Sequence, residues 1–581
     1  MKLPPVGLIE EILREFAAQQ GEDAPDAVQE QAEAVIDIAG RLDHVGSVLL
    51  HGNTGVGKTV QALAVAYLRS ALTNRPAVVL APSKTILKAR WRPDAIHLER
   101  ALEALLRRSP RRADFAKLCG VERQEAVAFD TAGANRLTGR PFVVLSTKRI
   151  FGNERLEANE MIRRRNFLAC AEPCLLVIDE AHHGTSPKSD TGRVLRHVLE
   201  PVQRGTWRVP LLTLSATPVR QHSNNLTDIL ELNLGEHAPG FEAVEDYQKA
   251  IHQLVFAWWR TGSVPPIPPT LGRLQQKSHA TLRKHVVRQR PKGSDPDRPG
   301  CETVTVAADA PWLRGYGIAR VLPALLREAE RGQEEHVDEV LPCDSYRRML
   351  LSSSAAFWHS AVARTLARRT STAAQDLLRT LELLLGPREQ RTRVQALLHR
   401  KVRWTVTRAK QEATTRQVLI FVEYLDTVDD LLVAFGRPKG LKVASAAHAS
   451  DVDSFRDATK GMVLVASPRH QEGLDLDYRG HRRERSRLLI HHDLPWSAVA
   501  LRQRHGRLQR IRRNFPSIEA VAPVMSLPDD QRLWQTVNAR WAVMDVMGAD
   551  ILDREGVLAD GAPEPSALPS ELVPLFRMLP S

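Results

Sequence analysis

A glycine-rich segment near the start of the chain has the residue types and the spacing of a phosphate-binding loop. Gly52, Gly57, Lys58 and Thr59 fit the pattern G-x-x-x-x-G-K-T inside the segment Ser47–Leu68. The apolar run before Gly52 predicts a strand and the run after Lys58 predicts a helix, which is the context that this loop requires. Glycines let successive backbone N–H groups face phosphate oxygens, and the N-terminus of the helix favours their negative charge. The segment therefore predicts a nucleoside triphosphate site.

Each residue of this loop has an expected role in holding the triphosphate. Lys58 would contact the β- and γ-phosphates as a point charge, and the Thr59 hydroxyl would be a ligand of Mg²⁺. Backbone N–H groups of the intervening loop would face the same phosphates, and its residues are Asn53, Thr54, Gly55 and Val56.

Two adjacent acids end an apolar run later in the chain, in the segment Leu175–His183 (LLVIDEAHH). Neighbouring side chains of a strand point to opposite faces, but at the end of a strand they are free to converge. Asp179 would then hold Mg²⁺, directly or through water, and Glu180 would orient and deprotonate the attacking water. A strand that ends in a solvated acidic turn is the alternative, and the phosphate loop in the same chain favours the catalytic interpretation.

These motifs must be positioned by strands, and two stretches of the chain repeat a short apolar strand followed by a helix. This alternation is typical of a parallel sheet covered by helices on both faces. We therefore expect two doubly wound α/β domains. The strands expected in the first are Ser47–His51, Ala77–Ala81, Phe142–Ser146, Cys174–Ile178 and Leu211–Leu214, and those in the second are Gln417–Phe421, Leu441–Ser445, Met462–Ala466, Leu488–His492 and Ala520–Val524.

A region of different pattern separates these stretches. Ala373–Leu385 and Arg391–Val406 place apolar residues at helical spacing, whereas Val264–Thr270 and Glu334–Glu339 have the composition of loops. The expected domains are an N-terminal helical segment (1–45), a first α/β domain (46–225), a mostly helical insertion (226–410), a second α/β domain (411–525) and a C-terminal helix with an extended tail (526–581).

The charge of the chain favours a polyanionic partner. The formal net charge is +13, and Lys and Arg gain free energy when they displace counterions from phosphates; a solvated basic surface is the alternative. The 43% hydrophobic content excludes a disordered chain. No apolar stretch approaches the roughly 20 residues that span a bilayer, and the N-terminus carries acids where a signal peptide carries bases, so no membrane contact and a cytoplasmic location are expected. Five cysteines without CxxC spacing predict reduced thiols rather than a metal site.

Further motifs occur in the order that is typical of one family. DEAH at Asp179–His182 and SATP at Ser215–Pro218 resemble helicase superfamily 2. Other segments are similar to motifs of that superfamily: Ala81–Trp91, Leu145–Phe151, Val418–Tyr424, Gln471–Leu476 and Gln503–Arg510. The resemblance covers about residues 30–550. It implies two tandem RecA-like domains with a helical insertion between them, which hydrolyse ATP with Mg²⁺ and move on nucleic acid.

The resemblance also implies roles for individual positions. Arg507 and Arg510 would reach across the cleft between the domains to the γ-phosphate, so hydrolysis would need a closed cleft. An Arg-rich helix that docks on nucleic acid is the alternative. Gln31 would contact adenine, although Gln29 is equally near. Further nucleotide contacts would come from Gly473 and Asp475, and coupling between nucleotide and nucleic acid would come from His182, Ser215, Thr217 and Gln503.

The same resemblance places a nucleic-acid strand across the carboxyl ends of both sheets. Contacts to phosphates carry no base information, so we expect sequence-independent binding with a steep salt dependence. The expected contacts are Ser83, Lys84, Ser146, Thr147, Lys148, Ser467 and Arg469. Three basic clusters, Arg107–Arg112, Arg283–Arg290 and Arg482–Arg487, would extend this track or form solvated faces, and Trp258 and Trp259 would stack on bases or pack in a core.

Several segments resemble the Swi/Snf-like branch of the superfamily, including its bacterial members. They are the DLPW segment within His492–Ile511, the basic segment Thr281–Lys292, which is expected to be helical, and Tyr346–Ser360 (YRRMLLSSSAAFWHS). Ser467 stands where Thr is usual, and an Arg-rich insertion follows at Tyr478–Arg487, which leaves the nucleic-acid contacts of the second domain open. The branch implies a translocase on double-stranded DNA. The alternatives are a strand-separating helicase on DNA or RNA, and a nucleotide-gated DNA-binding adaptor that recruits a protein partner with an effector activity.

Overall fold

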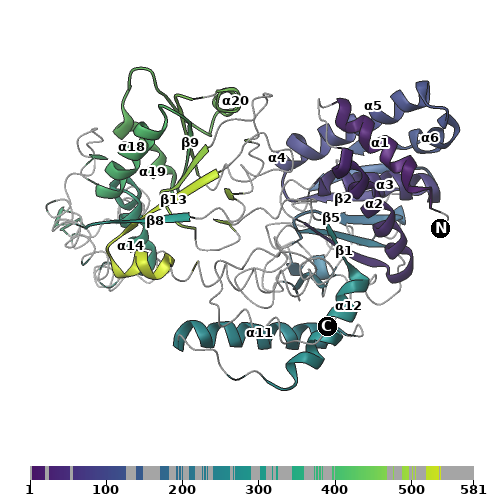
Figure 1. The fold of residues 1–581 in the computed structure, drawn as a ribbon, viewed down its shortest axis with the longest axis horizontal. Coiled ribbons are helices and arrows are strands. Elements are labelled where there is room, and N and C mark those ends of the chain that lie inside the picture. The colour runs from purple at the N-terminus through teal and green to yellow at the C-terminus, as the bar shows by residue number, and fades with distance from the viewer. Residues whose placement is uncertain are drawn as a thin grey trace. The chain divides into compact units, whose positions relative to one another are not determined.

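The computed structural model divides the chain into two compact units (Figure 1). Unit 1 comprises residues 1–295 and 539–581, and unit 2 comprises residues 296–538. The described residues are 3–19, 25–52, 57–125, 139–147, 166, 171–181, 192–193, 195–197, 199, 209–215, 226, 228–230, 232, 240–261, 266, 268–289, 301–308, 317, 322, 324, 343–358, 372, 375–376, 379–380, 383, 396–397, 399–458, 460–467, 476, 487–495, 500–501, 504–505, 518–534 and 537.

Unit 1 is built on a seven-stranded parallel sheet in the order β3-β4-β2-β5-β6-β1-β7. The strands are β1 (Ser47–Gly52), β2 (Ala77–Ala81), β3 (Glu122–Glu125), β4 (Phe142–Thr147), β5 (Leu175–Ile178), β6 (Leu211–Ser215) and β7 (Val286–Gln289). All residues of β1, β2, β5 and β6 are buried, as expected for strands covered on both faces. Because the strands are parallel, their carboxyl ends meet at one edge of the sheet.

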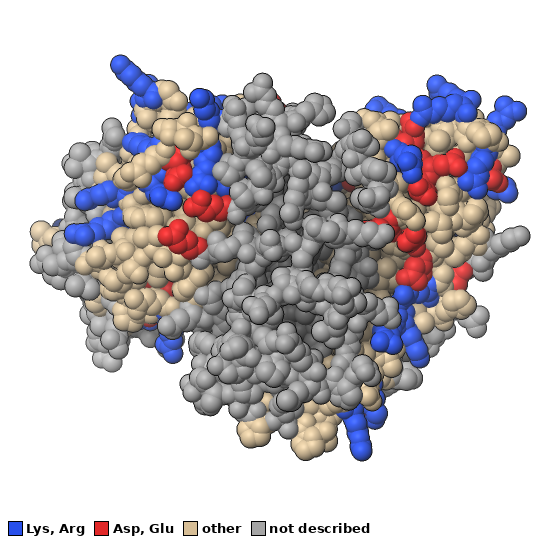
Figure 2. All heavy atoms as spheres, in the orientation of Figure 1, with Lys and Arg blue, Asp and Glu red and all other residues tan. Residues whose placement is uncertain are grey.

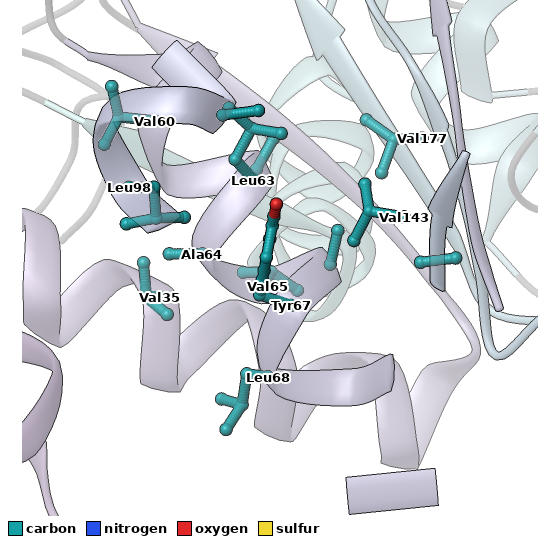
Figure 3. Close-up of a cluster of buried hydrophobic side chains, with 14 of the residues drawn as sticks. Val35, Val60, Leu63, Ala64, Val65, Tyr67, Leu68, Leu98, Val143 and Val177 are labelled. Atoms are coloured by element: carbon teal, nitrogen blue, oxygen red, sulfur yellow. The ribbon is translucent and has the colours of Figure 1, made fainter. Parts of the chain in front are cut away.

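One helix forms the centre of the core of unit 1. α3 (Lys58–Thr73) is buried on every side along most of its length, which is typical of a helix enclosed by other elements. Figure 3 shows its side chains between those of Val35 and Leu98 from neighbouring helices and those of Val143 and Val177 from the sheet. This packing fixes the axis of α3, and therefore the position of its N-terminus beside β1.

Further helices cover α3 and the sheet of unit 1. They are α1 (Val6–Gln19), α2 (Pro25–Val45), α5 (Arg92–Arg108), α6 (Arg112–Cys119) and α12 (Leu271–His285), and α11 (Phe241–Thr261) packs on α12. α2 packs on both α1 and α3, and it buries apolar residues at helical spacing, which are Val28, Ala32, Val35, Ala39 and Leu42. A short helix α4 (Lys84–Ile86) and a π-helical turn η1 (Leu87–Trp91) lead from β2 into α5.

The region between the two expected α/β domains contributes one strand to each sheet. The basic segment that begins at Thr281 is expected to be helical throughout, but its helix α12 ends at His285, and β7 follows beside β1. Val286 and Val287 are buried there, and their branched side chains favour a strand over a helix. The helical expectation is therefore wrong for Val286–Gln289.

Unit 2 is built on a six-stranded parallel sheet in the order β10-β11-β9-β12-β13-β8. The strands are β8 (Cys301–Val306), β9 (Gln417–Phe421), β10 (Lys442–Ser445), β11 (Met462–Ala466), β12 (Arg487–His491) and β13 (Ile518–Met525). Helices α14 (Cys343–Ser352), α18 (Arg400–Glu412) and α19 (Leu425–Phe435) form a connected group in which α18 also packs over β9, β12 and β13, and α20 (Ala449–Asp457) packs on β10 and β11.

The predicted fold class is confirmed, because the chain contains two doubly wound parallel-sheet domains of the RecA-like kind. All ten predicted strands are present, each within two residues of its expected bounds. β3, β7 and β8 were not expected, and each lies at an edge of its sheet. No helix in the described part of the chain is long and apolar enough to cross a membrane.

Two cysteines have described side chains, and both are free thiols: Cys119 and Cys174. Burial raises the pKa of both thiols. Among the described residues no cluster of His, Cys, Asp or Glu could hold a metal ion with three such ligands.

Candidate functional site

The carboxyl end of β1 and the N-terminus of α3 form the two ends of the predicted phosphate loop. Gly52 ends β1 and Lys58 begins α3. The Lys58 Nζ donates to the carbonyl oxygen of Gly52 over 2.6 Å, so the ammonium group lies at the carboxyl edge of the sheet. Gly57 has φ of +83°, a left-handed conformation that glycine adopts without steric cost. The four loop residues between Gly52 and Gly57 lie outside the described residues.

The acid pair lies at the same edge, directly after β5. The Asp179 N–H donates to the Leu80 carbonyl of β2 over 3.0 Å, and the Ala181 N–H donates to the Leu214 carbonyl of β6 over 2.8 Å. The turn is therefore tied to the strands on both sides of β5. Glu180 has φ of +45°, which is uncommon for a residue other than glycine and occurs often at functional sites.

The side chains at this edge fit Mg²⁺ and a triphosphate in their chemistry. The buried Asp179 offers carboxylate oxygens and the half-buried Thr59 offers a hydroxyl, and oxygen is the donor atom that Mg²⁺ prefers. Lys58 and the first N–H groups of α3 offer positive charge to phosphates. Lys58, Thr59, Asp179 and Glu180 therefore form one candidate site on the sheet of unit 1.

Gln31 of α2 lies directly against the phosphate loop. A Cβ atom built on Gly57 would lie 2.5 Å from the Gln31 Nε2, so only glycine permits this close approach. Gln29 is exposed, and its amide donates to the Glu33 Oε1 over 3.0 Å. Of the two glutamines that the sequence left open, Gln31 is the one beside the loop, and its contact with adenine stays a prediction.

A buried hydrogen bond to Asp179 comes from Trp91, for which the sequence predicts no role of its own. Trp91 is fully buried, and its Nε1 donates to the Asp179 Oδ2 over 2.8 Å. The Glu180 N–H donates to the Asp179 Oδ1 over 2.8 Å. Both oxygens of the carboxylate are thus oriented by donors. Trp91 closes the motif-like segment that begins at Ala81, but nothing in its spacing indicates that its ring contacts the acid.

The residues expected to contact nucleic acid in unit 1 differ in their exposure. Lys84 is exposed. Ser83 is half-buried, and its Oγ accepts the Ile86 N–H over 3.2 Å, so this hydroxyl caps α4. Ser146, near the end of β4, is 3% exposed, so its hydroxyl does not lie on the surface. The basic segment after β2 is therefore the accessible part of this expected track.

The three basic clusters also have different surroundings. In the first, Arg108 and Arg111 pair with Glu15 and Glu11 of α1. Figure 2 shows basic and acidic side chains next to one another over these helices. In the second, Arg283 is exposed near the end of α12. Arg108 and Arg111 thus fasten α1 to the helices beneath it.

One member of the third cluster corrects the expectation of a basic track or a solvated face. Arg487 begins β12 and is 1% exposed. Its Nε donates to the Gln417 Oε1 over 2.5 Å, and its guanidinium carbon lies over the Phe455 ring, 5.2 Å from the ring centroid. The guanidinium group can be buried because it is hydrogen-bonded to Gln417 and packs on the ring of Phe455 in the core of unit 2.

A buried network in unit 2 joins the segments that resemble motor motifs. Arg504 is fully buried and donates to the Asp493 carbonyl oxygen over 2.6 Å. It also pairs with the Glu423 carboxylate, and its guanidinium carbon lies 5.1 Å from the centroid of the Phe421 ring. A buried charge needs such partners, because removing one of them leaves the other uncompensated. Arg504 is therefore tied to the residues that follow β9 and β12.

Asp493 connects this network to the end of α14. Its carboxylate accepts the Ser352 hydroxyl over 2.6 Å and the Glu423 N–H over 2.9 Å, and the Lys401 Nζ lies 3.7 Å away. Burial alone would raise the pKa of Asp493, but the neighbouring His492 and Lys401 and these hydrogen bonds hold it below its usual value. The ionised carboxylate thus ties α14 to the carboxyl ends of β9 and β12.

Two buried histidines fasten the same segment. The His399 Nε2 donates to the Leu350 carbonyl over 3.0 Å, and its Nδ1 accepts the Val402 N–H over 3.4 Å. The His492 Nε2 donates to the Ser352 carbonyl over 2.9 Å. Burial lowers the pKa of both histidines, for His399 to about 3. The His399 ring is therefore neutral at ordinary pH.

The remaining predicted positions lie only partly within the described residues. Ser215 and Ser467 are buried at the ends of β6 and β11, and the Ser215 carbonyl accepts a hydrogen bond from the His51 Nδ1 over 3.2 Å. The side chains of Thr147, Trp258 and Trp259 lie outside the described residues. So do the following residues in full: Asn53, Thr54, Gly55, Val56, Lys148, His182, Thr217, Arg469, Gly473, Asp475, Gln503, Arg507 and Arg510. Their roles stay predictions.

Comparison with known proteins relates the first part of the chain to one family. Residues 25–220, about a third of the chain, match the family described as "Type III restriction enzyme, res subunit". No curated protein matches the chain. This family match spans the phosphate loop and the DEAH segment, and it supports the resemblance to helicase superfamily 2.

Two solved structures are similar to the chain over most of its length. The Hef helicase domain of Pyrococcus furiosus has a TM-score of 0.42 and 15% identity, over 87% of this chain and 97% of that chain. The SWI2/SNF2 ATPase core of Sulfolobus solfataricus in complex with dsDNA has a TM-score of 0.31 and 11% identity, over 90% of this chain and 92% of that chain.

Proposed function

We propose that this protein is an ATP-dependent nucleic-acid motor that translocates on double-stranded DNA, with a DEAH-type ATPase centre of the Swi/Snf-like branch. The observation that carries the ATPase is the meeting of Lys58, Thr59, Asp179 and Glu180 at one edge of the sheet of unit 1. The family match over residues 25–220 supports it. The assignment to double-stranded DNA rests on the resemblance of the DLPW and serine-rich segments.

In this proposal the residues of the site divide the work of hydrolysis. Lys58 binds phosphate oxygens, and bound Mg²⁺ neutralises charge on the phosphates. Asp179 would bind Mg²⁺ directly or through water, while Glu180 orients the attacking water and takes its proton. Arg507 and Arg510 complete the positive charge around the γ-phosphate from the second motor domain, which makes hydrolysis depend on domain closure.

The test is ATP hydrolysis measured with double-stranded DNA, single-stranded DNA and RNA. We expect double-stranded DNA to stimulate most, and Lys58→Ala and Glu180→Gln to lower the stimulated kcat by about 100-fold or more, the usual contribution of such groups. Glu172→Gln is a matched control for Glu180→Gln, because Glu172 also has a positive φ (42°) but is exposed before β5. Turnover of Glu180→Gln at the wild-type rate would contradict the proposal.

Translocation and strand separation are distinguished by two substrates. A translocase on double-stranded DNA displaces the third strand of a triplex but leaves a forked duplex paired. Unwinding of the fork at the rate of ATP hydrolysis would instead identify a strand-separating helicase.

A second proposal concerns assembly: the chain acts as a nucleotide-gated subunit that needs a protein partner. It is favoured by the match to a family described as a subunit of a restriction enzyme. Purification of the tagged chain from its native host tests it. A partner that is retained with ATP and released with ADP supports the proposal, whereas a chain that elutes alone in both nucleotides rules it out.

A further inference from the structure

The buried side chain of Trp91 has one polar group, and that group is hydrogen-bonded to Asp179. The indole ring is fully buried, and its Nε1, which can only donate, bonds to the Asp179 Oδ2 over 2.8 Å. The Asp179 Oδ1 accepts the Glu180 N–H over 2.8 Å. Each oxygen of the carboxylate therefore has one oriented donor and keeps a further lone pair for another ligand.

The direction of the Trp91 side chain depends on an unusual turn. Leu87–Trp91 is a π-helical turn between the short helix α4 and the long helix α5. Such turns add one residue to a helix and occur often at functional sites. In a regular α-helix a shift by one residue rotates a side chain by about 100°. The π-helical turn thus sets the face from which Trp91 reaches Asp179.

The same short segment carries exposed positive charge. Lys84 lies in α4 and Lys88 lies in η1, and both side chains are exposed. Ser83 fixes the start of this segment at the carboxyl end of β2 by capping α4. Two exposed ammonium groups and the buried donor to Asp179 are therefore carried on one continuous helical segment, Lys84–Trp91.

We propose that Trp91 is a positioning residue that holds Asp179 in the geometry for Mg²⁺ and links it to phosphate-backbone binding at Lys84 and Lys88. The link to nucleic acid rests on the proposed function, whereas the effect on Mg²⁺ does not. Residues that orient a metal ligand change metal affinity when they are removed, although they do not touch the metal. By linkage, nucleic acid and Mg²⁺–nucleotide must then strengthen each other's binding by the same factor.

The first test is the Mg²⁺ dependence of nucleotide binding, measured by fluorescence of a labelled ADP without nucleic acid. Trp91→Phe keeps an apolar ring and removes the donor. We expect unchanged ADP affinity in EDTA and a Mg²⁺ midpoint raised by about 10-fold, the lower end of the effect of such orienting residues. Trp404→Phe, at a half-buried position in α18 of unit 2, is the matched control and should leave the midpoint unchanged.

The second test measures the link to nucleic acid in the same binding assay. In the wild-type protein, saturating duplex DNA lowers the Mg²⁺ midpoint, and in Trp91→Phe we expect this shift to shrink toward none. If Trp91→Phe does not fold, the exposed pair Lys84→Ala/Lys88→Ala is measured at saturating DNA instead. A reduced shift in that variant supports the link, and a shift of full size overturns it.

The outcomes separate this inference from the proposed function. An unchanged Mg²⁺ midpoint in folded Trp91→Phe overturns the positioning role of Trp91, even if the wild-type protein hydrolyses ATP on DNA. If Trp91→Phe raises the Mg²⁺ midpoint but DNA does not stimulate ATP hydrolysis by the wild-type protein, the positioning role of Trp91 stands and the proposed motor function is contradicted. An equal loss of ADP affinity with EDTA and with Mg²⁺ would show a general structural defect and also overturns the inference.

Discussion

At Gly57 the phosphate loop, the start of α3 and the side chain of Gln31 come into direct contact. The left-handed φ of +83° favours glycine at this position, and a Cβ there would also lie 2.5 Å from the Gln31 Nε2. The amide end of Gln31 can move away from a methyl group, but the backbone conformation cannot be kept cheaply by another residue. A left-handed conformation costs an L-residue roughly 1–2 kcal/mol.

Gly57→Ala is therefore expected to weaken nucleotide binding as well as stability. Relief of the strain turns the N–H groups at the start of α3, and the methyl group displaces Gln31, so we expect about 10-fold weaker binding, equivalent to about 1.4 kcal/mol. Nucleotide titration by calorimetry or fluorescence measures this loss. Gly46→Ala is the matched control: Gly46 has φ of +72° at the other end of β1, with open space around its Cβ position.

Both glycine variants carry the same kind of backbone strain, so both should lower the free energy of unfolding by about 1–2 kcal/mol. Only Gly57→Ala should lose affinity for nucleotide. Equal affinity in the two variants would mean that the conformation of Gly57 has no part in phosphate binding.

Among the elements of unit 2, the junction of α14 and α18 depends on a neutral histidine. His399 is fully buried between a carbonyl acceptor and a backbone donor. Burial is the main cause that lowers its pKa to about 3, and the neighbouring His492 and Lys401 lower it further, against the opposing effects of the Leu350 carbonyl and Asp493. A protonated ring would lose the bond from Val402, because it would have no acceptor nitrogen.

This histidine predicts that unit 2 loses stability in mild acid. The folded pKa of about 3 lies below the ordinary histidine pKa of 6.5, so the unfolded chain binds more protons between these values. The contribution of His399 is complete above about pH 6.5 and falls as the pH decreases, by about 1.4 kcal/mol at pH 5.5. Urea unfolding of the full chain at pH 7.5 and 5.5 measures this difference.

Substitution isolates the histidine from the other titrating groups. His399→Gln keeps a donor for the Leu350 carbonyl and cannot be protonated, so its stability should fall less between the two pH values than that of the wild-type protein. His448→Gln, at an exposed position before α20, should retain the wild-type difference. An undiminished acid effect in His399→Gln would assign the loss to other groups.

The central strands of both sheets are predictable because their burial on both faces leaves runs of Val, Ile and Leu in the sequence. Of the four edge strands, β10 is predicted from the sequence, but β3, β7 and β8 are not. β3 reads ERQE, without an apolar residue, and β7 directly follows a helix whose pattern continues into it. Both depend on pairing with residues far away in the chain, such as that of Val286 with Leu49. The pattern of neighbouring residues in the sequence does not predict such long-range pairs.

The candidate site likewise contains residues that the local sequence predicts and residues that it does not. The phosphate loop and the acid pair are local patterns, so their residues can be named from the sequence alone. The bond from Trp91 to Asp179 joins residues 88 positions apart, and the network of Arg504, Glu423 and Asp493 joins three separate segments. For Arg487 the local pattern is misleading. Its basic run predicts an exposed residue, but the fold buries it against Gln417 and Phe455, which are distant in the sequence.

At the scale of the whole molecule, the net charge of +13 does not say which basic residues meet nucleic acid. Arg108 and Arg111 are already paired with acids of α1. Lys84 and Lys88 are exposed at the carboxyl edge of the sheet of unit 1, and within the described part of the chain no ion pair includes either of them. Positive charge contributes to phosphate binding only where it releases counterions, so the two pairs should behave differently.

Two double variants with the same change in net charge separate these pairs. Lys84→Ala/Lys88→Ala should reduce the slope of log K against log salt for a DNA duplex by about 2, because each phosphate contact contributes about 0.9. Arg108→Ala/Arg111→Ala should leave this slope unchanged and lower the stability of unit 1, since it releases α1 from α5 and α6. Fluorescence anisotropy from 50 to 200 mM salt measures the slopes, a range over which six to ten phosphate contacts cost about 10³–10⁵ in affinity. Equal slopes in the two variants would show that net charge, rather than the position of the lysines, governs binding.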